Sequence, residues 1–156
     1  MQISVRDILV ESVGYSRAYK ITGEKPDLET VLLTSPLDGE LSIARLDGGV
    51  LVRGHVKGSV ELECHRCLRT FERPFELNLS QLFAADPGDD EMPIIDDLID
   101  LAPLVEQEIV LSLPIKILCR PDCQGIENAG VKYTRDNPAR LGDQARITKG
   151  NKRGRT

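Results

Sequence analysis

The longest alternation of apolar and polar residues in this chain lies between residues 50 and 64. One side of it carries two glycines, Gly54 and Gly58, among the apolar residues Val50, Val52, Val56, Val60, Leu62 and Cys64. The other side carries Leu51, Arg53, His55, Lys57, Ser59, Glu61 and Glu63. A period of two predicts a β-strand with one buried and one solvent-exposed face. Glycines on the buried side indicate bends or bulges, as in a curled sheet.

Two further strands are predicted beside this one. Residues 39–46 (GELSIARL) precede Asp47-Gly48-Gly49, a strong signal for a hairpin turn. Beyond a short second turn the alternation resumes, which predicts another antiparallel strand over residues 70–83. The three strands together form a β-meander. Nearer the N-terminus, ISVRDIL and SRAYKIT also have strand-like patterns, whereas DLETVLLTS fits either a strand or a short helix.

One main helix is predicted after residue 100. Its apolar positions have helical spacing: Leu101, Leu104, Val105 and Ile109. Asp100 is a candidate N-cap, Pro103 is tolerated in the first turn, and Pro114 ends the helix. Residues 106–108 (EQE) would form its solvent-exposed face, and residues 86–97 form an acidic loop that precedes it.

Composition places the chain among soluble globular proteins. It has 156 residues, of which 40% are hydrophobic and 29% are charged. No apolar run approaches the roughly 20 residues that cross a bilayer. Charges within MQISVRDILVES interrupt the apolar stretch that a signal peptide needs. We therefore expect a cytoplasmic protein that does not contact a membrane.

The net charge of −5 is the sum of two opposite parts. Residues 132–156 carry eight basic and two acidic side chains, a net charge of +6, whereas residues 1–131 carry a net charge of −11. The C-terminal segment is also poor in apolar residues and rich in Gly and Asn. We expect a folded domain over residues 1–130 and a basic, disordered tail over residues 131–156.

All four cysteines lie in two tight pairs. The first pair is Cys64 and Cys67, the second is Cys119 and Cys123, and 51 residues separate the pairs. Two short pairs far apart in sequence are typical of a zinc site with four thiolate ligands. Such a site is structural, because four protein ligands leave no open coordination position. Neighbouring basic residues would offset its negative charge: Arg66, Arg69, Lys116 and Arg120.

Other interpretations of the cysteines remain open at this point. A redox-active CxxC pair needs its first cysteine at a helix N-terminus, whereas a turn between strands is predicted here. Two disulfides need an oxidising compartment. Four unliganded thiols are the simplest alternative. His65 could replace one thiolate, although a residue inside such a turn normally points away from the metal.

Three motifs in this order resemble the YceD family, also called large ribosomal RNA subunit accumulation proteins. They are CHRCLRTFERPF (residues 64–75), IDLAPLVEQEIVLSLP (99–114) and LCRPDCQGI (118–126). The resemblance extends over about residues 1–130. Many members of the family continue with a CPxCG motif, but here residues 125–130 read GIENAG and lack both cysteines.

The resemblance implies a bacterial or plastid factor in ribosome biogenesis, needed for accumulation or processing of large-subunit (23S) rRNA. It implies no enzymatic activity, and the chain has no phosphate-binding loop, nucleophile elbow or HExxH motif. The expected partners are large-subunit rRNA or a pre-ribosomal particle, and also a basic ribosomal protein held by the acidic residues. The alternatives are a zinc-stabilised interaction module unrelated to ribosomes and a CxxC thiol oxidoreductase.

An acidic domain can contact rRNA phosphates only through a local basic patch. One candidate is the exposed strand face around Arg53 and Lys57, continued by the basic residues near the first cysteine pair, namely Arg66, Arg69 and Arg73. The other is the tail, through Lys149, Lys152, Arg153 and Arg155.

Taken together, the expected fold is an α+β domain. It consists of a curled antiparallel meander with one main helix, a zinc knuckle and a disordered basic tail.

Overall fold

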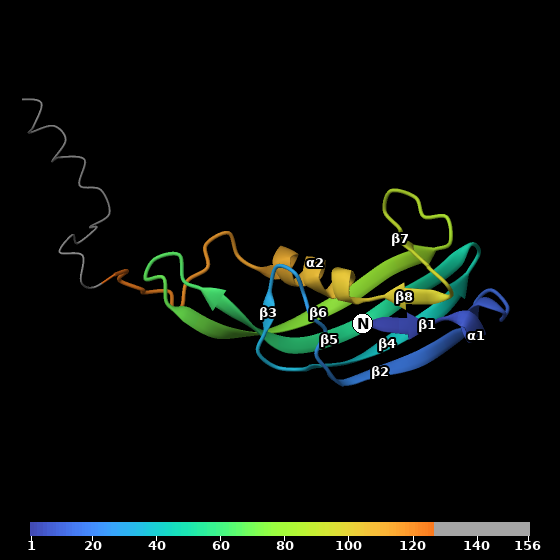
Figure 1. Ribbon diagram of the computed structural model, residues 1–156, viewed down its shortest axis with the longest axis horizontal. Coiled ribbons are helices and arrows are strands. Elements are labelled where there is room, and N and C mark those ends of the chain that lie inside the picture. Colours follow the sequence, from blue (N-terminus) through green and yellow to red (C-terminus); the bar gives the residue numbers. More distant parts are fainter. Residues whose placement is uncertain (127–156) are drawn as a thin grey trace, which may run out of the picture. The chain divides into compact units, whose positions relative to one another are not determined.

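The structure, a computed structural model, describes residues 1–126. The predicted tail over residues 131–156 lies outside the described residues. In chain order the elements are β1 (Gln2–Ser4), α1 (Arg6–Leu9), β2 (Ser16–Glu24), β3 (Leu32–Leu33), β4 (Leu37–Leu46), β5 (Gly49–Glu63), β6 (Thr70–Ala84), β7 (Met92–Pro93), β8 (Leu98–Asp100) and α2 (Ala102–Ser112) (Figure 1).

A six-stranded open sheet forms the framework. Its order is β2-β4-β5-β6-β7, and β3 pairs with β5 beyond the end of β4. The predicted meander is confirmed, because β4, β5 and β6 pair antiparallel in sequence order. Only the short β7 runs parallel to its neighbour. β1 and β8 form a separate two-stranded ribbon.

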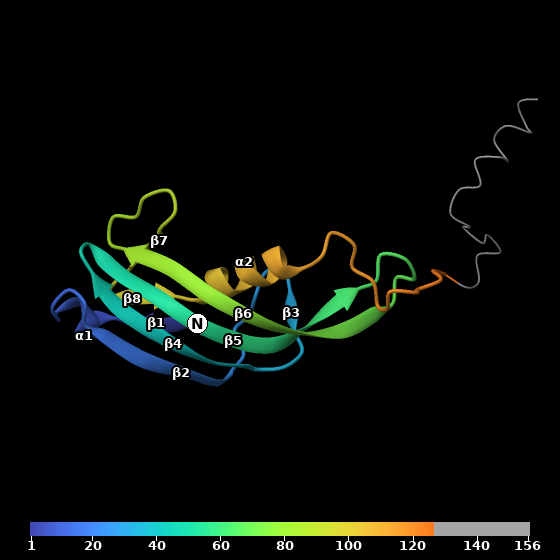
Figure 2. The same ribbon diagram turned by 180° about the vertical axis from the view of Figure 1, so that it is seen from behind.

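The β5–β6 hairpin is the longest pairing in the sheet (Figure 2). Its register runs from Gly49 opposite Ala84 to Glu63 opposite Thr70, with no shift between. The alternation seen in the sequence is confirmed: one face of β5 is buried, and Arg53, His55 and Lys57 on the other face are exposed. The predicted Asp47-Gly48 turn joins β4 to β5, with Gly48 at a φ of 85°.

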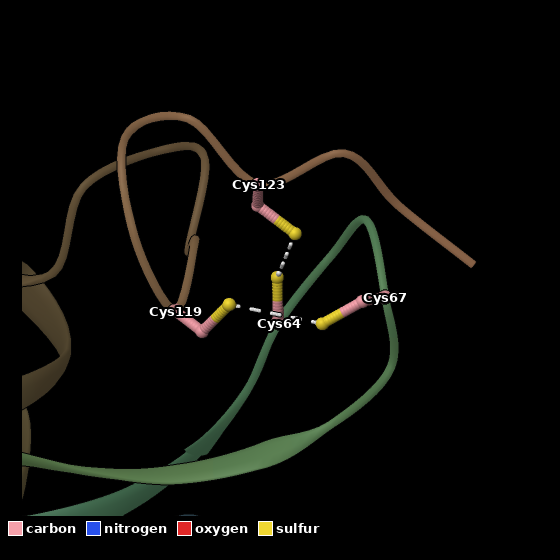
Figure 3. A group of neighbouring side chains, drawn as sticks. All are labelled: Cys64, Cys67, Cys119 and Cys123. Atoms are coloured by element: carbon pink, nitrogen blue, oxygen red, sulfur yellow. Dashed lines mark hydrogen bonds between the residues drawn. The ribbon is translucent and has the colours of Figure 1, made fainter. Parts of the chain in front are cut away.

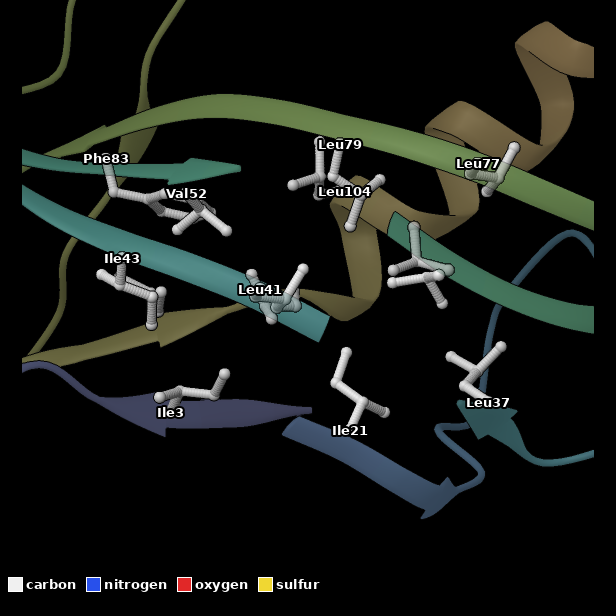
Figure 4. Close-up of a cluster of buried hydrophobic side chains, with 14 of the residues drawn as sticks. Ile3, Ile21, Leu37, Leu41, Ile43, Val52, Leu77, Leu79, Phe83 and Leu104 are labelled. Atoms are coloured by element: carbon white, nitrogen blue, oxygen red, sulfur yellow. The ribbon is translucent and has the colours of Figure 1, made fainter. Parts of the chain in front are cut away.

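The hydrophobic core lies on the side of the sheet that α2 covers (Figure 4). Side chains of β4, β5 and β6 meet the buried residues of α2, which are Leu104, Val105 and Ile109. The β1–β8 ribbon adds Ile3 and Ile99 to the same cluster. Within residues 1–126 the opposite face of the sheet is polar and carries no helix, as is common for antiparallel sheets.

Asp100 acts one position earlier than a standard N-cap residue. Its Oδ1 accepts a hydrogen bond from the N–H of Ala102 (3.0 Å) and lies 2.9 Å from the amino group of Met1. Leu101 occupies the N-cap position and makes no side-chain cap. Burial raises the pKa of Asp100, but the Ala102 N–H and the ammonium group outweigh burial and hold this pKa below its ordinary value.

The sequence-based prediction is less accurate near the N-terminus. ISVRDIL is not one strand, because β1 ends at Ser4 and the single turn α1 follows. The ambiguous segment 27–35 contains only the two-residue strand β3. The side chain of Glu106 is not simply solvated, since its carboxylate accepts hydrogen bonds from the backbone N–H and the hydroxyl of Thr30. This contact ties the loop before β3 to α2.

Both glycines on the buried face of β5 are sites of close contact. A Cβ at Gly54 would collide with the carbonyl oxygen of Glu40 and lie 2.7 Å from the Cα of Leu41. A Cβ at Gly58 would instead meet the side-chain ends of Leu37 and Phe75, each at 2.9 Å. The contact at Gly54 is with the backbone of the neighbouring strand β4, whereas the side chains that contact Gly58 can move.

We expect Gly54→Ala to lower the free energy of unfolding by about 3 kcal/mol and Gly58→Ala by about 1 kcal/mol. The difference follows from the rigidity of the β4 backbone compared with the side chains of Leu37 and Phe75. Urea denaturation of both variants measures it. Equal losses of unfolding free energy in the two variants, or a larger loss for Gly58→Ala, would show that the backbone of β4 shifts more easily than its pairing with β5 indicates.

Candidate metal centre

The first cysteine pair lies in the turn between β5 and β6. Cys64 follows the last residue of β5, and its N–H donates to the carbonyl oxygen of Arg69 (2.9 Å). The N–H of Leu68 donates back to the carbonyl oxygen of Cys64 (2.9 Å), and Leu68 has a φ of 59°. These bonds close a tight turn that contains Cys67.

The second pair reaches this turn through the segment that follows α2. The N–H of His65 donates to the carbonyl oxygen of Ile117 (2.8 Å), and the N–H of Ile117 donates to Nδ1 of His65 (3.4 Å). Arg66 Nη1 also donates to the carbonyl oxygen of Cys123 (2.9 Å). Sequence analysis did not find these links, because nothing in the local pattern of residues 113–118 indicates their partner.

The four sulfur atoms converge on one point (Figure 3). The Sγ atoms of Cys64 and Cys123 are 3.7 Å apart, as are those of Cys67 and Cys119. All four sulfurs lie within 4.8 Å of one another. A tetrahedron with metal–sulfur bonds of about 2.3 Å has edges of about 3.8 Å. The cluster therefore has the size and ligand set that a tetrahedral, thiolate-bound metal ion needs.

The same geometry bears on the other interpretations of the cysteines. All four are free thiols, and the 3.7 Å separations far exceed the roughly 2.05 Å of a disulfide bond. Cys64 lies at the end of a strand and is completely buried. A reactive CxxC cysteine instead needs access to its substrate. Nδ1 of His65 accepts a hydrogen bond from the backbone, and the imidazole is not part of the sulfur cluster.

Hydrogen bonds within the turn favour a thiolate at Cys64. The backbone N–H of Cys67 lowers its pKa most; burial raises it, and the N–H groups of Cys119 and Arg66 lower it further, to about 5. Burial and the other three cysteines raise the pKa of Cys119 to about 12. The negative charge of Cys64 is thus stabilised in the metal-free cluster, and ionisation of Cys119 is opposed unless a cation is present.

In the metal-free chain we expect the thiolate of Cys64 to be present at neutral pH, because its pKa lies near 5 rather than 9. This ionisation stabilises the fold above the ordinary thiol pKa, and the stabilisation is lost as the pH falls toward about 5. Ultraviolet absorbance of the thiolate across a pH titration measures it. Cys64→Ser should remove the acidic transition, whereas a wild-type chain that ionises only at alkaline pH would contradict the expectation.

The basic residues near the cysteines are only partly engaged with them. Arg66 contacts the backbone of Cys123, and Arg120 Nε lies 3.7 Å from a carboxylate oxygen of Asp122. Among the hydrogen bonds of residues 1–126, the side chains of Arg69 and Lys116 make none to a sulfur atom. Arg66 therefore links the two halves of the cluster, while Arg69 is exposed to solvent.

The sheet register separates the candidate RNA-binding residues. Arg53 and Lys57 lie on the exposed face of β5, but Arg73 pairs with the buried Val60 and so belongs to the opposite face. Between Lys57 and the cysteine turn the exposed face of the hairpin is acidic, through Glu61, Glu63 and Glu72, and Glu76 lies directly opposite Lys57. The register thus separates Arg73 from Arg53 and Lys57. Lys149, Lys152, Arg153 and Arg155 lie outside the described residues.

Comparison with known proteins adds independent information. The family model described as large ribosomal RNA subunit accumulation protein YceD matches residues 52–146, which include all four cysteines. The chain is 35% identical over 98 residues to the uncharacterized protein Rv2926c of Mycobacterium tuberculosis (strain ATCC 25618 / H37Rv), covering 58% of this chain and 47% of that protein. It is 36% identical over 72 residues to the uncharacterized protein YlbN of Bacillus subtilis (strain 168), covering 43% and 42%.

A third relative, the uncharacterized protein ML1660 of Mycobacterium leprae (strain TN), is 29% identical over 109 residues, which cover 64% of this chain and 50% of that protein. The chain thus spans about half the length of the curated relatives it matches. No solved structure matches it. Within residues 1–126, no helix is both long and apolar enough to cross a membrane. Because the family model matches well over half of the chain, the protein belongs to the YceD family of large ribosomal RNA subunit accumulation proteins.

Proposed function

We propose that this protein is a noncatalytic factor that promotes the accumulation of large-subunit (23S) rRNA. The observation that carries this proposal is the family match, which covers most of β5 and all of β6, α2 and both cysteine pairs. Its action is to bind rRNA or a ribosomal protein within a pre-ribosomal particle in the cytoplasm. The cysteine cluster supports a binding role, because four thiolate ligands leave a metal no open position for chemistry.

We assign Zn²⁺ as the ion that Cys64, Cys67, Cys119 and Cys123 would hold. Four thiolates at tetrahedral spacing are the ligand set that zinc prefers among the common divalent ions. The ion joins the turn after β5 to the segment after α2, so its role is to stabilise the fold. Neither the relatives nor the family description names a metal, and this assignment rests on the chemistry of the donor atoms.

Protein purified without added metal should contain one zinc ion per chain, as measured by elemental mass spectrometry. Cys64→Ser should abolish the zinc, because it removes a buried ligand. His65→Ala is the matched control and should keep the metal, since the imidazole bonds to the backbone of Ile117 and not to the ion. Full zinc occupancy in Cys64→Ser, or its loss in His65→Ala alone, would require a different ligand set.

Contact with RNA must be local, because residues 1–126 carry 12 basic and 22 acidic side chains. We assign it to two groups of residues. The first consists of Arg53 and Lys57 on the exposed sheet face, and the second is the basic segment 132–156. Arg73 would contact RNA separately from Arg53 and Lys57, because the register places it on the other face of the hairpin, and Arg66 and Arg69 lie in the turn beyond the ladder.

Deleting the gene in its host should lower the amount of large-subunit rRNA relative to small-subunit rRNA, as measured from total RNA. Expression of the chain should restore the ratio. A variant with Lys149, Lys152, Arg153 and Arg155 all changed to Gln should restore it less well, because these side chains are proposed to neutralise phosphates. Glu24→Gln, a substitution on β2, is the control and should restore the ratio as the wild-type chain does.

An unchanged rRNA ratio in the deletion strain would overturn the proposed function. Full restoration by the quadruple Gln variant would instead remove these four side chains from the RNA contact and favour the sheet face as the candidate. Exchange of the Cys64 and Cys67 thiols with a disulfide substrate by the metal-loaded protein would favour the competing interpretation of a thiol oxidoreductase.

A further inference from the structure

A cavity of about 360 Å³ lies near the end of β6 that is remote from the cysteine turn. Most of its lining is apolar and comes from Phe83, Met92, Pro93, Ile95, Leu98 and Pro103. Gln2, Asp96 and Asp100 complete it. Ile95 is 63% exposed although it is a large apolar residue. An open apolar cavity of this volume can receive a large side chain from another molecule.

The surroundings of this cavity are acidic. Residues 74–115 carry ten acidic side chains and no Lys or Arg. Asp96 lies in the lining itself, and Asp86, Asp89, Asp90 and Glu91 lie in the loop that joins two other lining residues, Phe83 and Met92. Asp90 also lines a separate hollow together with Arg53. None of these five acidic residues takes part in an ion pair within residues 1–126, whereas Asp97 and Asp100 are paired with Arg6 and the amino group of Met1.

Hydrogen bonds hold the acidic segment against the sheet. The side-chain amide of Gln81 donates to the carbonyl oxygens of Leu82 (3.1 Å) and Asp90 (2.8 Å). Glu91 Oε2 accepts from the N–H of Gly88 (2.9 Å). The N–H of Ile94 donates to the carbonyl oxygen of Ala84 (2.8 Å), which fixes the chain beside the cavity. The backbone beside the cavity is therefore fixed before a partner binds, which lowers the entropic cost of binding.

The β5–β6 hairpin separates this cavity from the metal centre. Phe83 lines the cavity and pairs with Val50, whereas the cysteine turn follows Glu63 at the other end of the ladder. Thirteen residues of extended strand correspond to about 40 Å. Figure 1 shows the loop that carries β7 at the end of the hairpin opposite the cysteine turn. The two sites can therefore be occupied at the same time.

We propose that this cavity and its acidic rim bind a basic, extended polypeptide segment that inserts one large apolar side chain into the cavity. Burial of the apolar side chain supplies most of the affinity, and Lys or Arg residues beside it are attracted by Asp96 in the lining and by the acidic loop over residues 86–91. The sign of the charge selects against the phosphate backbone of RNA at this site. The inference does not depend on the proposed role in rRNA accumulation.

Fluorescence anisotropy with a labelled synthetic peptide tests the proposal at physiological ionic strength. The peptide contains Lys, Arg and Gly residues around one central Leu, and the matched peptide has Ser in place of Leu. The Leu peptide should bind the full chain about tenfold more tightly than the Ser peptide, because only Leu gains from burial. Ile95→Ser should reduce this preference. Because Ile95 is exposed, the variant should keep the fold, which circular dichroism checks.

Charge is tested with a triple variant, Asp89→Asn with Asp90→Asn and Asp96→Asn. Asn tolerates the φ of 53° at position 96, so this change removes charge without straining the turn. The triple variant should bind the Leu peptide about tenfold more weakly. The matched control removes three charges from the exposed face of the sheet, through Glu40→Gln, Glu61→Gln and Glu72→Gln, and should bind as the wild type does.

Equal weakening in the two triple variants would show a general attraction between opposite charges and would overturn the site. So would equal affinity for the Leu and Ser peptides. A short oligouridine RNA could also displace the peptide. If it did so from the Glu→Gln control variant but not from the Asp→Asn triple variant, the acidic rim would be assigned to RNA and not to a polypeptide. Each of these results would overturn the proposed site even if the protein does promote the accumulation of large-subunit rRNA.

Discussion

The backbone pairing between β5 and β6 is the constraint on which the rest of the structure depends. Because its register has no shift from Gly49 to Glu63, it decides which face every side chain of the hairpin occupies. The core face then receives α2 and the β1–β8 ribbon, while the opposite face remains polar. The same pairing places the cysteine turn at one end and the acidic segment at the other. A slip by one residue would expose Val52 and Val56 and bury Arg53.

The parts of the fold that could be predicted from sequence are those in which burial alone determines the pattern. The period of two in β5 and the helical spacing in α2 are of this kind. β1 and β8 were not predictable in the same way, because each has three residues and is defined by its partner almost a hundred residues away. Arg73 is instructive: its proximity in sequence to Arg69 suggested one patch, although the alternation through Phe71 and Phe75 already placed it on the other face.

The candidate metal centre was predictable to a similar extent. Spacing within each pair identified Cys64, Cys67, Cys119 and Cys123 as possible ligands, because short pairs bring two sulfurs to one side of a turn. The meeting of the pairs across 51 intervening residues was not visible in any local pattern. It depends on backbone hydrogen bonds between His65 and Ile117 and on the bond from Arg66 to Cys123, all of which exist only in the folded chain.

The position of the cysteine pairs has a consequence for the unfolded chain as well. A metal ion that joins Cys67 to Cys119 closes a ring that contains β6, β7, β8 and α2. For a loop of 51 residues the entropy removed from the unfolded state is worth about 4 kcal/mol on the polymer model used for disulfides. The ion would then act as a reversible cross-link. A metal cross-link of this kind persists in a reducing compartment, whereas a disulfide does not. The stability that the ion adds to the fold would depend on the concentration of available metal in the cell.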